Sequence, residues 1–262
     1  MKKVLITGAA GGLGLAAAKY FVEKGCKVYA LDFNQKVLDE INDPNIVPVQ
    51  VDVTSDESVV KALEVVQADT DILDGIINFA GILTMGAMIE LPASSAGSIL
   101  GINLVGMYRI NQQFFPLLQK GKGRIINISS ETGVLSPVPF SGFYTMSKHA
   151  VEVYSDTIRR ELKFLGIQVI KIRPGSFATQ MQGGATGLLK NAMENTTLFK
   201  ANMQKGLTMA EKNTGGAKDP RILAAVIYKA FTANKPKLAY GANINKQLRF
   251  ISMLPERLQD FI

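Results

Sequence analysis

Short apolar runs rich in β-branched residues alternate with longer amphipathic stretches along the first two thirds of the chain. The runs are typical of strands buried on both faces of a parallel sheet, and they lie at residues 4–7, 27–31, 46–51, 75–78, 124–129 and 168–172. The amphipathic stretches have helical spacing and lie at 13–24, 56–67, 99–118 and 143–165. Because parallel strands need crossover connections, this order predicts an α/β fold, a doubly wound parallel sheet with helices on both faces.

The pattern weakens towards the C-terminus. From about residue 176 to 216 it changes to Gly, Asn, Thr and Met with a faint helical signal, which predicts a mobile lid over a site. No internal repeat, low-complexity segment or linker divides the chain. We therefore expect residues 1–262 to form a single domain, with its substrate lid at about 176–216.

The N-terminus has some features of a secretory signal, because two lysines precede the apolar run 4–18. Four glycines within residues 8–14 interrupt that run, and a turn between a strand and a helix explains them better. The other long apolar stretch, 75–89, is too short and too polar to span a membrane. Together with the free Cys26, these features predict a cytoplasmic protein without an integral membrane segment.

Composition limits the chemistry. A chain with one His and one Cys has no His-pair metal site, internal disulfide or thiolate zinc cluster, so we expect no metal. The formal net charge is +7, and residues 190–250 account for it with eleven Lys and Arg against three acids. A solvated face explains this charge better than an anionic substrate or a membrane surface, although both alternatives stay open. No nucleic-acid-binding motif accompanies it, so we expect no nucleic-acid partner.

A glycine-rich turn follows the first predicted strand and opens the first predicted helix. Gly8, Gly12 and Gly14 would allow a sharp turn, bring the backbone close to a pyrophosphate and pack the helix against its strand. The N–H groups at the start of the helix, around Gly11 and Leu13, would then face the anion. A purely structural turn is the alternative, but the place between a strand and a helix favours a dinucleotide site.

Asp32 ends the second predicted strand. A carboxylate at this point can accept hydrogen bonds from an adenosine ribose and repels a 2′-phosphate. Phe33, Ala9 and Ala10 offer no positive charge to such a phosphate. The sequence therefore predicts NAD rather than NADP as the cofactor, and a helix N-cap is the alternative role for Asp32.

Two further strand ends carry candidate cofactor contacts. Asp52, followed by Val53, is placed to meet the adenine amino group or to cap the next helix, and both roles stay open. The fourth strand ends at Asn78, and Ala80 and Gly81 follow it as small residues at the carboxyl edge of the sheet, where open α/β sheets bind ligands.

Tyr144 and Lys148 are four residues apart on a predicted helix and therefore share one face. Free Tyr has a pKa of about 10, and a nearby ammonium lowers it towards the range useful for acid/base catalysis. The spacing alone is a weak signal. Ser129 and Ser130 end the preceding strand, where a hydroxyl can hold a substrate oxygen or cap a turn. His149 points away from the Tyr144 face, so we expect it to pack or to lie at an interface.

These residues together resemble the short-chain dehydrogenase/reductase family of the classical type. The matching elements stand in order over roughly residues 1–180: Gly8-x-x-x-Gly12-x-Gly14, Asp52, Asn78-Phe79-Ala80-Gly81, Asn103 within 102–106, Ser130, Tyr144-x-x-x-Lys148 and Pro174-Gly175-x-x-x-Thr179. Residues 254–258, Leu-Pro-Glu-Arg-Leu, are similar to a segment of the steroid- and retinol-dehydrogenase-like members. The resemblance implies a Rossmann fold whose parallel sheet has about seven strands. It also implies an oxidoreductase that acts on a CH–OH group with a nicotinamide cofactor.

The resemblance also implies roles for single residues. Tyr144 would be the general acid/base, and Ser130 would steady the substrate oxygen. Lys148 would hold the nicotinamide ribose and lower the pKa of Tyr144. Asn103 would anchor a water in the proton relay. The cofactor's amide would be contacted from the segment that contains Pro174, Gly175, Phe177 and Thr179.

Two positions depart from the family pattern. Phe79 replaces the second Asn of the fourth-strand motif, where a backbone contact to the cofactor would be kept. Ser130 lies fourteen residues before Tyr144, one more than is usual in the family, which leaves Ser129 as the alternative. We prefer Ser130 because it matches the second Ser of the motif.

Residues that would line a substrate site lie at 82–98, 131–143 and 176–216, and many of them are apolar or Met. Such a lining suits a lipophilic ketone or secondary alcohol, such as a steroid, a retinoid or an acyl compound. The same residues are equally suited to packing the lid onto the domain. The helices at 99–118 and 143–165 correspond to the family's usual contact faces, so we expect a homodimer or homotetramer.

Two rival functions use the same motifs. A nucleotide-sugar epimerase shares Tyr-x-x-x-Lys but has a longer C-terminal substrate domain than this chain offers. A non-catalytic NAD-sensing module would keep the glycines and lose the Ser–Tyr–Lys set, all of which is present. The sequence therefore favours an NAD(H)-dependent interconversion of a secondary alcohol and a ketone.

Overall fold

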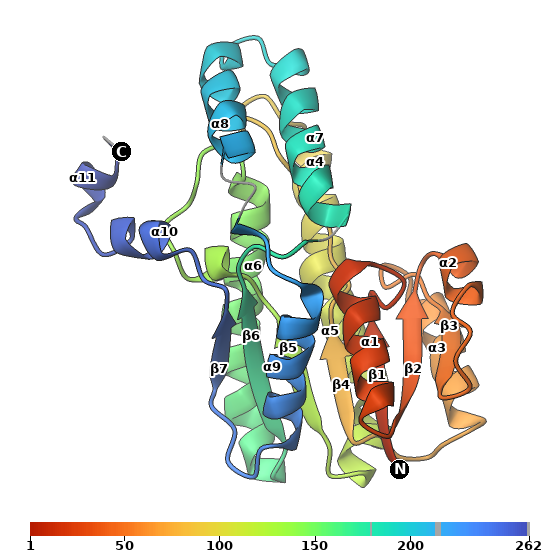
Figure 1. The fold of residues 1–262 in the computed structure, drawn as a ribbon. Coiled ribbons are helices and arrows are strands. Elements are labelled where there is room, and N and C mark those ends of the chain that lie inside the picture. The colour runs from red at the N-terminus through yellow and green to blue at the C-terminus, as the bar shows by residue number, and fades with distance from the viewer. Residues whose placement is uncertain (179, 213–215, 261–262) are drawn as a thin grey trace.

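The computed structural model describes residues 1–178, 180–212 and 216–260. Its centre is one parallel sheet in the order β3-β2-β1-β4-β5-β6-β7 (Figure 1). The strands are β1 (Lys2–Thr7), β2 (Cys26–Asp32), β3 (Ile46–Gln50), β4 (Gly75–Asn78), β5 (Arg124–Ile128), β6 (Gln168–Pro174) and β7 (Ala239–Ala242). The strand order reverses between β1 and β4. This topology confirms the predicted doubly wound sheet.

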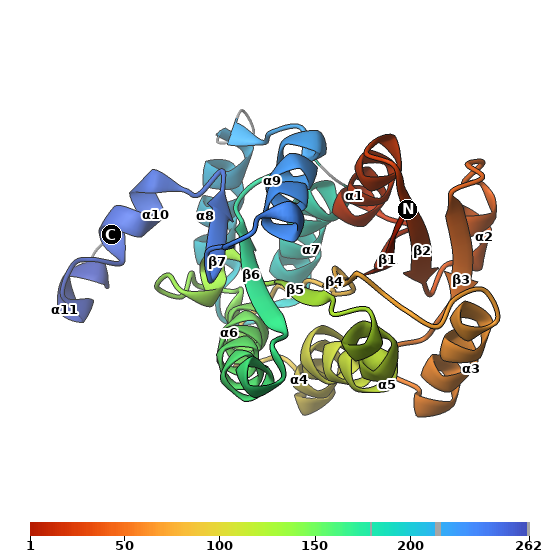
Figure 2. The same ribbon diagram turned by 90° about the horizontal axis from the view of Figure 1, so that it is seen from below.

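Helices cover both faces of the sheet (Figure 2). One face carries α1 (Gly12–Glu23), α2 (Gln35–Asp39) and α9 (Pro220–Thr232). The other carries α3 (Asp56–Gln67), α4 (Ala93–Leu100), α5 (Met107–Lys120) and α6 (Gly142–Leu162). Above the carboxyl ends of the strands stand α7 (Gln180–Asn195) and α8 (Lys200–Lys212), and α10 (Lys246–Ile251) and α11 (Glu256–Gln259) project beyond β7 (Figure 1). In the described ranges, no helix combines the length and apolar character needed to cross a membrane.

The core has two layers, one on each side of the sheet. Val4 of β1 packs with Phe21 and Phe231 on the α1 and α9 side. Its neighbour Leu5 packs with Phe114 on the α5 side. Because successive side chains of a strand point to opposite faces, a strand that is buried on both faces is apolar throughout. This explains the unbroken apolar runs in the sequence.

The elements agree with the sequence prediction to different degrees. The helix at 56–67 and the strand at 75–78 are found at the predicted residues, and the Ser55 side chain caps the former by accepting from Ser58 N–H. The predicted helix at 99–118 is wrong in its first part, because α4 begins at Ala93 and a π-helical turn (Gly101–Gly106) separates it from α5. A π turn has more residues per turn than an α-helix but leaves the apolar pattern readable, so periodicity did not reveal it.

The C-terminal third contains more regular structure than its pattern indicated. The described part of the stretch 176–216 contains α7 and α8, and α9 and β7 follow them. The start of α9 has a local signal, because the Asp219 side chain accepts from Arg221 N–H and Pro220 occupies the first turn.

Candidate active site

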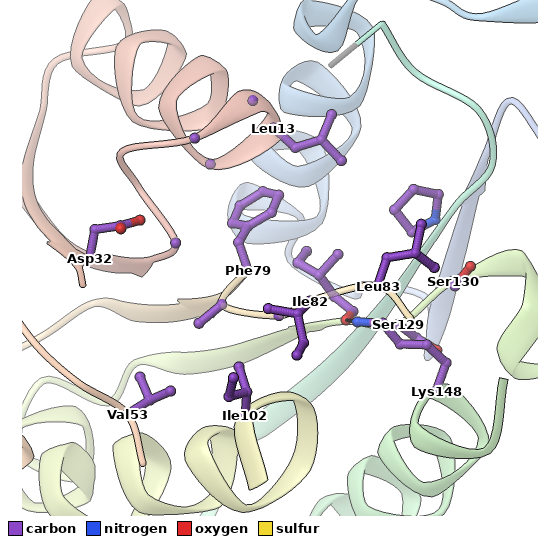
Figure 3. Close-up of a pocket in the computed structure, with 18 of the residues that line it drawn as sticks. Leu13, Asp32, Val53, Phe79, Ile82, Leu83, Ile102, Ser129, Ser130 and Lys148 are labelled. Atoms are coloured by element: carbon purple, nitrogen blue, oxygen red, sulfur yellow. Dashed lines mark hydrogen bonds between the residues drawn. The ribbon is translucent and has the colours of Figure 1, made fainter. Parts of the chain in front are cut away.

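A cavity of about 790 Å³ lies at the carboxyl ends of the strands, beside the reversal between β1 and β4. This is the place where open α/β sheets bind ligands. Figure 3 shows Asp32 towards one end of the cavity and Ser130 and Lys148 at the other, with Phe79 and Ile82 between them. Ala185 of α7 also lines the cavity, so this helix above the sheet forms part of its wall.

The backbone of the glycine-rich turn packs so tightly that side chains at Gly8 and Gly14 would not fit. Gly8 has a φ of +67°, and a Cβ added to it would lie 2.9 Å from the Ala80 nitrogen. A Cβ on Gly14 would lie 2.1 Å from the Gly8 carbonyl oxygen. Gly11 is the N-cap of α1 and makes no side-chain cap, and Gly11 to Gly14 all line the cavity. The first N–H groups of α1 are therefore placed to receive an anion such as a pyrophosphate.

Asp32 lines the cavity and is held from both sides. Its carboxylate accepts from Ala10 N–H and from Asn34 N–H, each at 3.0 Å. The N-cap of α2 is Asn34 and not Asp32. The alternative role of Asp32 as a helix cap is therefore wrong, and its carboxylate is oriented by the glycine-rich turn.

Asp52 and Val53 line the same end of the cavity. The Asp52 carboxylate accepts from the N–H and the hydroxyl of Thr54 at 2.8 and 2.7 Å. Because Ser55 is the cap of α3, the helix-cap role left open for Asp52 is also wrong. Asp52 closes a turn, and its contact to adenine stays a prediction.

Ser130, Tyr144 and Lys148 meet at the other end of the cavity. Lys148 Nζ donates to the Ile128 carbonyl at 3.0 Å and lies 5.8 Å from the centre of the Tyr144 ring. The Ser130 Oγ accepts from the N–H and the hydroxyl of Thr132 at 3.2 and 3.0 Å. Both serines at the end of β5 line the cavity, and the Ser130 hydroxyl acts on the pKa of Tyr144. This favours Ser130 over Ser129 as the partner of Tyr144.

Burial controls the proton affinities of this group. It raises the pKa of Tyr144, and the Ser130 hydroxyl offsets part of that rise. It lowers the pKa of Lys148 to about 8, because an ammonium loses hydration in the interior. The expected lowering of the Tyr144 pKa by Lys148 is therefore not found, because loss of hydration raises this pKa and the Glu131 charge adds to the rise.

A family model described as short chain dehydrogenase matches residues 2–187. The chain belongs to this family. Retinol dehydrogenase 16 of Mus musculus is 31% identical over 99% of this chain and 86% of its own length. The mitochondrial D-beta-hydroxybutyrate dehydrogenase of Bos taurus is 30% identical over 91% of this chain and 76% of its own length. The chain is thus a short-chain oxidoreductase that acts on CH–OH donors, with retinol-dehydrogenase-like relatives.

Solved structures show the same fold. A short-chain dehydrogenase from Streptomyces avermitilis superimposes with a TM-score of 0.79 over 95% of this chain and 89% of its own, at 23% identity. A 3-ketoacyl-(acyl-carrier-protein) reductase from Brucella melitensis, complexed with NADH, gives 0.77 over 92% and 96% of the two chains, at 19% identity. The family and this fold imply a nicotinamide cofactor.

Asn103, which the family resemblance placed in the proton relay, does not line the cavity. It is buried in the π-helical turn, accepts from Ile82 N–H at 2.7 Å, and donates to the Ile82 carbonyl at 3.0 Å and to Ser147 Oγ at 2.9 Å. The Ser147 hydroxyl in turn donates to the Tyr144 carbonyl at 2.7 Å. Asn103 therefore joins the loop after β4 to the turn of α6 that carries Tyr144, and its contact to a relay water stays a prediction.

The other predicted cofactor residues divide into three groups. Ala80, Gly81, Pro174, Gly175 and Phe177 line the cavity. Asn78 does not, because it is buried and donates to the side-chain oxygens of Asn111 and Asn127, both at 2.9 Å. Thr179 lies outside the described residues.

Several cavity residues were not predicted, among them Thr54 and Ile102. Thr54 and Ile102 stand next to the motif residues Val53 and Asn103, and that adjacency is the signal that would have found them. Ala185 lies in the stretch 176–216 that was expected to line the substrate site, but the sequence did not single it out, because its position depends on how α7 folds back over the sheet. His149 is exposed, as expected for a residue off the Tyr144 face, and its Nδ1 lies 3.0 Å from the Thr145 carbonyl.

Part of the apolar segments proposed to bind substrate packs the helical pair onto the domain. Leu83 and Phe177 line the cavity. A separate apolar cluster contains Met85, Ala87, Phe140, Leu189, Met193, Phe199, Met203 and Leu207. Most of these side chains attach α7 and α8 to the loops after β4 and β5, so the packing role is right for this set.

Proposed function

We propose that the chain is an NAD(H)-dependent enzyme that interconverts a secondary alcohol and a ketone on a lipophilic substrate, with Tyr144 as general acid/base. One observation carries the proposal. Ser130, Tyr144 and Lys148 meet at one end of a cavity whose other end combines the glycine-rich turn with Asp32. We take residues 1–262 as one functional unit, in which α7 and α8 form the lid.

The residues of the cavity fit a nicotinamide dinucleotide. The absence of room for a Cβ at Gly8 and Gly14 and the uncapped start of α1 match a pyrophosphate. When bound, the nicotinamide supplies or accepts the hydride. Gly175 and Phe177 would hold its ring end, and Lys148 would reach its ribose.

In the reduction direction, Tyr144 gives its proton to the oxygen that becomes the alcohol. The phenol is protonated at neutral pH, and because burial raises its pKa it is a weak proton donor, so the tyrosinate formed by the transfer needs stabilisation. Ser130 Oγ already accepts two hydrogen bonds from Thr132, so its own proton can be donated either to Tyr144 or to the substrate oxygen. The Lys148 ammonium would stabilise the tyrosinate left after transfer.

The preference for NAD rests on the charges at the adenosine end. Asp32 presents a carboxylate there, where it would accept from ribose hydroxyls and repel a 2′-phosphate. Of the described residues that line the cavity, Lys148 is the only Lys or Arg, and it lies at the opposite end. NADP would thus meet a negative charge without a compensating cation.

The lipophilic substrate is proposed from the apolar walls near Ser130. Ile82, Leu83 and Ala185 offer the substrate mainly carbon atoms. Retinol in the name of one relative is a lipophilic alcohol, whereas the hydroxybutyrate in the name of another is a short hydroxy acid. The walls favour the first kind.

Oxidation of NADH with a panel of steroid ketones, acyl ketones and sugars tests the proposal. We expect turnover with the lipophilic ketones, and a lower kcat/KM when NADPH replaces NADH. Activity on sugars alone would overturn the lipophilic substrate, and a preference for NADPH would overturn the role of Asp32.

A further inference from the structure

The lid formed by α7 and α8 joins the sheet through two short backbone segments. We call residues 175–178 the first stalk and residues 216–218 the second stalk. They lie side by side, because Phe177 and Lys218 form a parallel bridge and Ala178 N–H donates to the Lys218 carbonyl at 2.9 Å. Lys218 N–H donates back to the Ser176 carbonyl at 3.3 Å. Since residues 175–177 line the cavity, the position of the stalks fixes part of its wall.

One side chain from the C-terminal segment bonds to both stalks. Asn243 directly follows β7, and its Nδ2 donates to the Ser176 carbonyl at 2.6 Å and to the Gly216 carbonyl at 2.9 Å. Its φ of +54° lies in the left-handed region, which Asn tolerates better than most residues. This backbone conformation and the paired amide N–H groups together suit Asn at this position.

The backbone around Asn243 is closely fitted to the first stalk. Gly175 N–H donates to the Ala242 carbonyl at 2.9 Å, and a Cβ on Gly175 would lie 2.0 Å from the Asn243 carbonyl oxygen. A shift of Asn243 would therefore move the first stalk as well as release the second.

The segment that carries Asn243 is itself anchored to the loop after Ser130. Asn245 N–H donates to the Glu131 carboxylate at 2.6 Å, and Ser136 N–H donates to Ser252 Oγ at 2.8 Å. The segment 243–252 thus lies between the loop 130–136 and the two stalks, with bonds to both. Burial raises the pKa of Glu131, which agrees with a carboxylate enclosed in this junction.

We propose that Asn243 is a positioning residue, which holds the two lid stalks together and so fixes the cavity wall formed by residues 175–177. The inference rests on the proposed function, since it takes that wall as the nicotinamide end of the site. It predicts that loss of the Asn243 amide loosens the stalks and weakens cofactor binding, although Asn243 does not touch the cavity.

Two variants separate the amide from the backbone conformation. Asn243→Gly keeps the left-handed backbone and removes both N–H donors. Asn243→Asp keeps the size of the side chain and its tolerance for this backbone, but it turns an oxygen towards two carbonyls. It therefore tests the same contact even if the Gly variant folds poorly. Asn42→Gly, in the exposed loop between α2 and β3, is the control because β3 lies at the opposite edge of the sheet from β7.

Two readouts are needed. Amide hydrogen exchange of the protein alone should be about tenfold faster at Ala178 and Lys218 in Asn243→Gly, as expected for the loss of two hydrogen bonds, and faster still in Asn243→Asp. The Kd for NADH, measured by NADH fluorescence, should rise by about tenfold. Asn42→Gly should match the wild type in both.

Unchanged amide hydrogen exchange at the stalks in both variants would overturn the inference, whether or not the wild type binds NADH. Faster exchange with an unchanged Kd would overturn the link between the stalks and the cofactor. Failure of the wild type to bind NADH would instead contradict the proposed function, and the exchange data would still decide whether Asn243 holds the stalks.

Discussion

At the residue scale, the ammonium of Lys148 lies almost fully buried beside Tyr144, with the Ile128 carbonyl as its hydrogen-bond acceptor. Its pKa of about 8 means that the ammonium loses its proton as the pH rises through that value. We expect kcat/KM for ketone reduction to be level through neutral pH and to fall above about pH 8. In Lys148→Arg the fall should move to higher pH, and an unmoved midpoint would exclude Lys148 as its source.

Lys148 should also lower the free energy of unfolding at neutral pH, although it is needed for turnover. Its pKa is lower in the folded protein than the ordinary 10.5. Between about pH 8 and 10.5 the folded state therefore binds fewer protons than the unfolded state. Because of this difference, the contribution of Lys148 to the free energy of unfolding rises with pH over that window. Below that pH window, the buried ammonium destabilises the folded state by about 3 kcal/mol. Replacing Lys148 would remove this destabilisation but would also remove the hydrogen bond to Ile128, which contributes about 1–3 kcal/mol.

We therefore expect Lys148→Met to unfold in urea at pH 7 with a free energy no lower than that of the wild type, while turnover is lost. A decrease in the free energy of unfolding by more than about 2 kcal/mol would show that the ammonium stabilises the fold.

Asp32 gives a prediction about the cofactor. In Asp32→Ala the ribose loses its acceptor and a 2′-phosphate no longer meets a negative charge. The ratio of kcat/KM for NADH to that for NADPH should fall by about tenfold or more. A ratio equal to that of the wild type would mean that Asp32 does not face the ribose.

At the scale of elements, the start of α1 depends on a contact between two glycines. Gly14→Ala places a Cβ 2.1 Å from the Gly8 carbonyl, so the helix must move away from the turn. We expect the free energy of unfolding to fall by about 2 kcal/mol or more, with weakened NADH binding. Gly97→Ala in α4 is the control, because its Cβ meets nothing within 4 Å, and it should stabilise by about 0.5–1 kcal/mol. Equal effects of the two substitutions in urea unfolding would refute the argument.

The sequence predicted those elements whose signals are local. The helix at 56–67 begins at a serine cap and the strand at 75–78 is a short apolar run, and both were found where predicted. From these elements the sequence also predicted the sheet and the residues at its carboxyl edge. It did not predict the hydrogen-bond partners of Asn78 and Asn103, because these buried amides bond to residues distant in the sequence. Asn243 was not singled out at all, since both carbonyls that it binds come from the lid stalks.

At the scale of the whole molecule, α5 and α6 present an exposed surface with an apolar groove of about 250 Å³ between them, lined in part by Tyr108, Phe115 and Leu165. Val153 on α6 is 68% exposed. We predict that this face joins copies of the chain, so light scattering should give at least twice the 28.4 kDa of one chain. Val153→Glu should lower that mass, whereas Val65→Glu on α3 should not. A monomeric wild type would contradict the prediction.

The central claim is that the cavity is a catalytic site and not only a dinucleotide sensor. Tyr144→Phe removes one oxygen atom from the end of the cavity opposite Asp32. The most direct test compares this variant with the wild type in NADH binding and in NADH-dependent ketone reduction. The account predicts a Kd for NADH within about twofold and a kcat lower by about 100-fold or more. Undiminished turnover in Tyr144→Phe would contradict it.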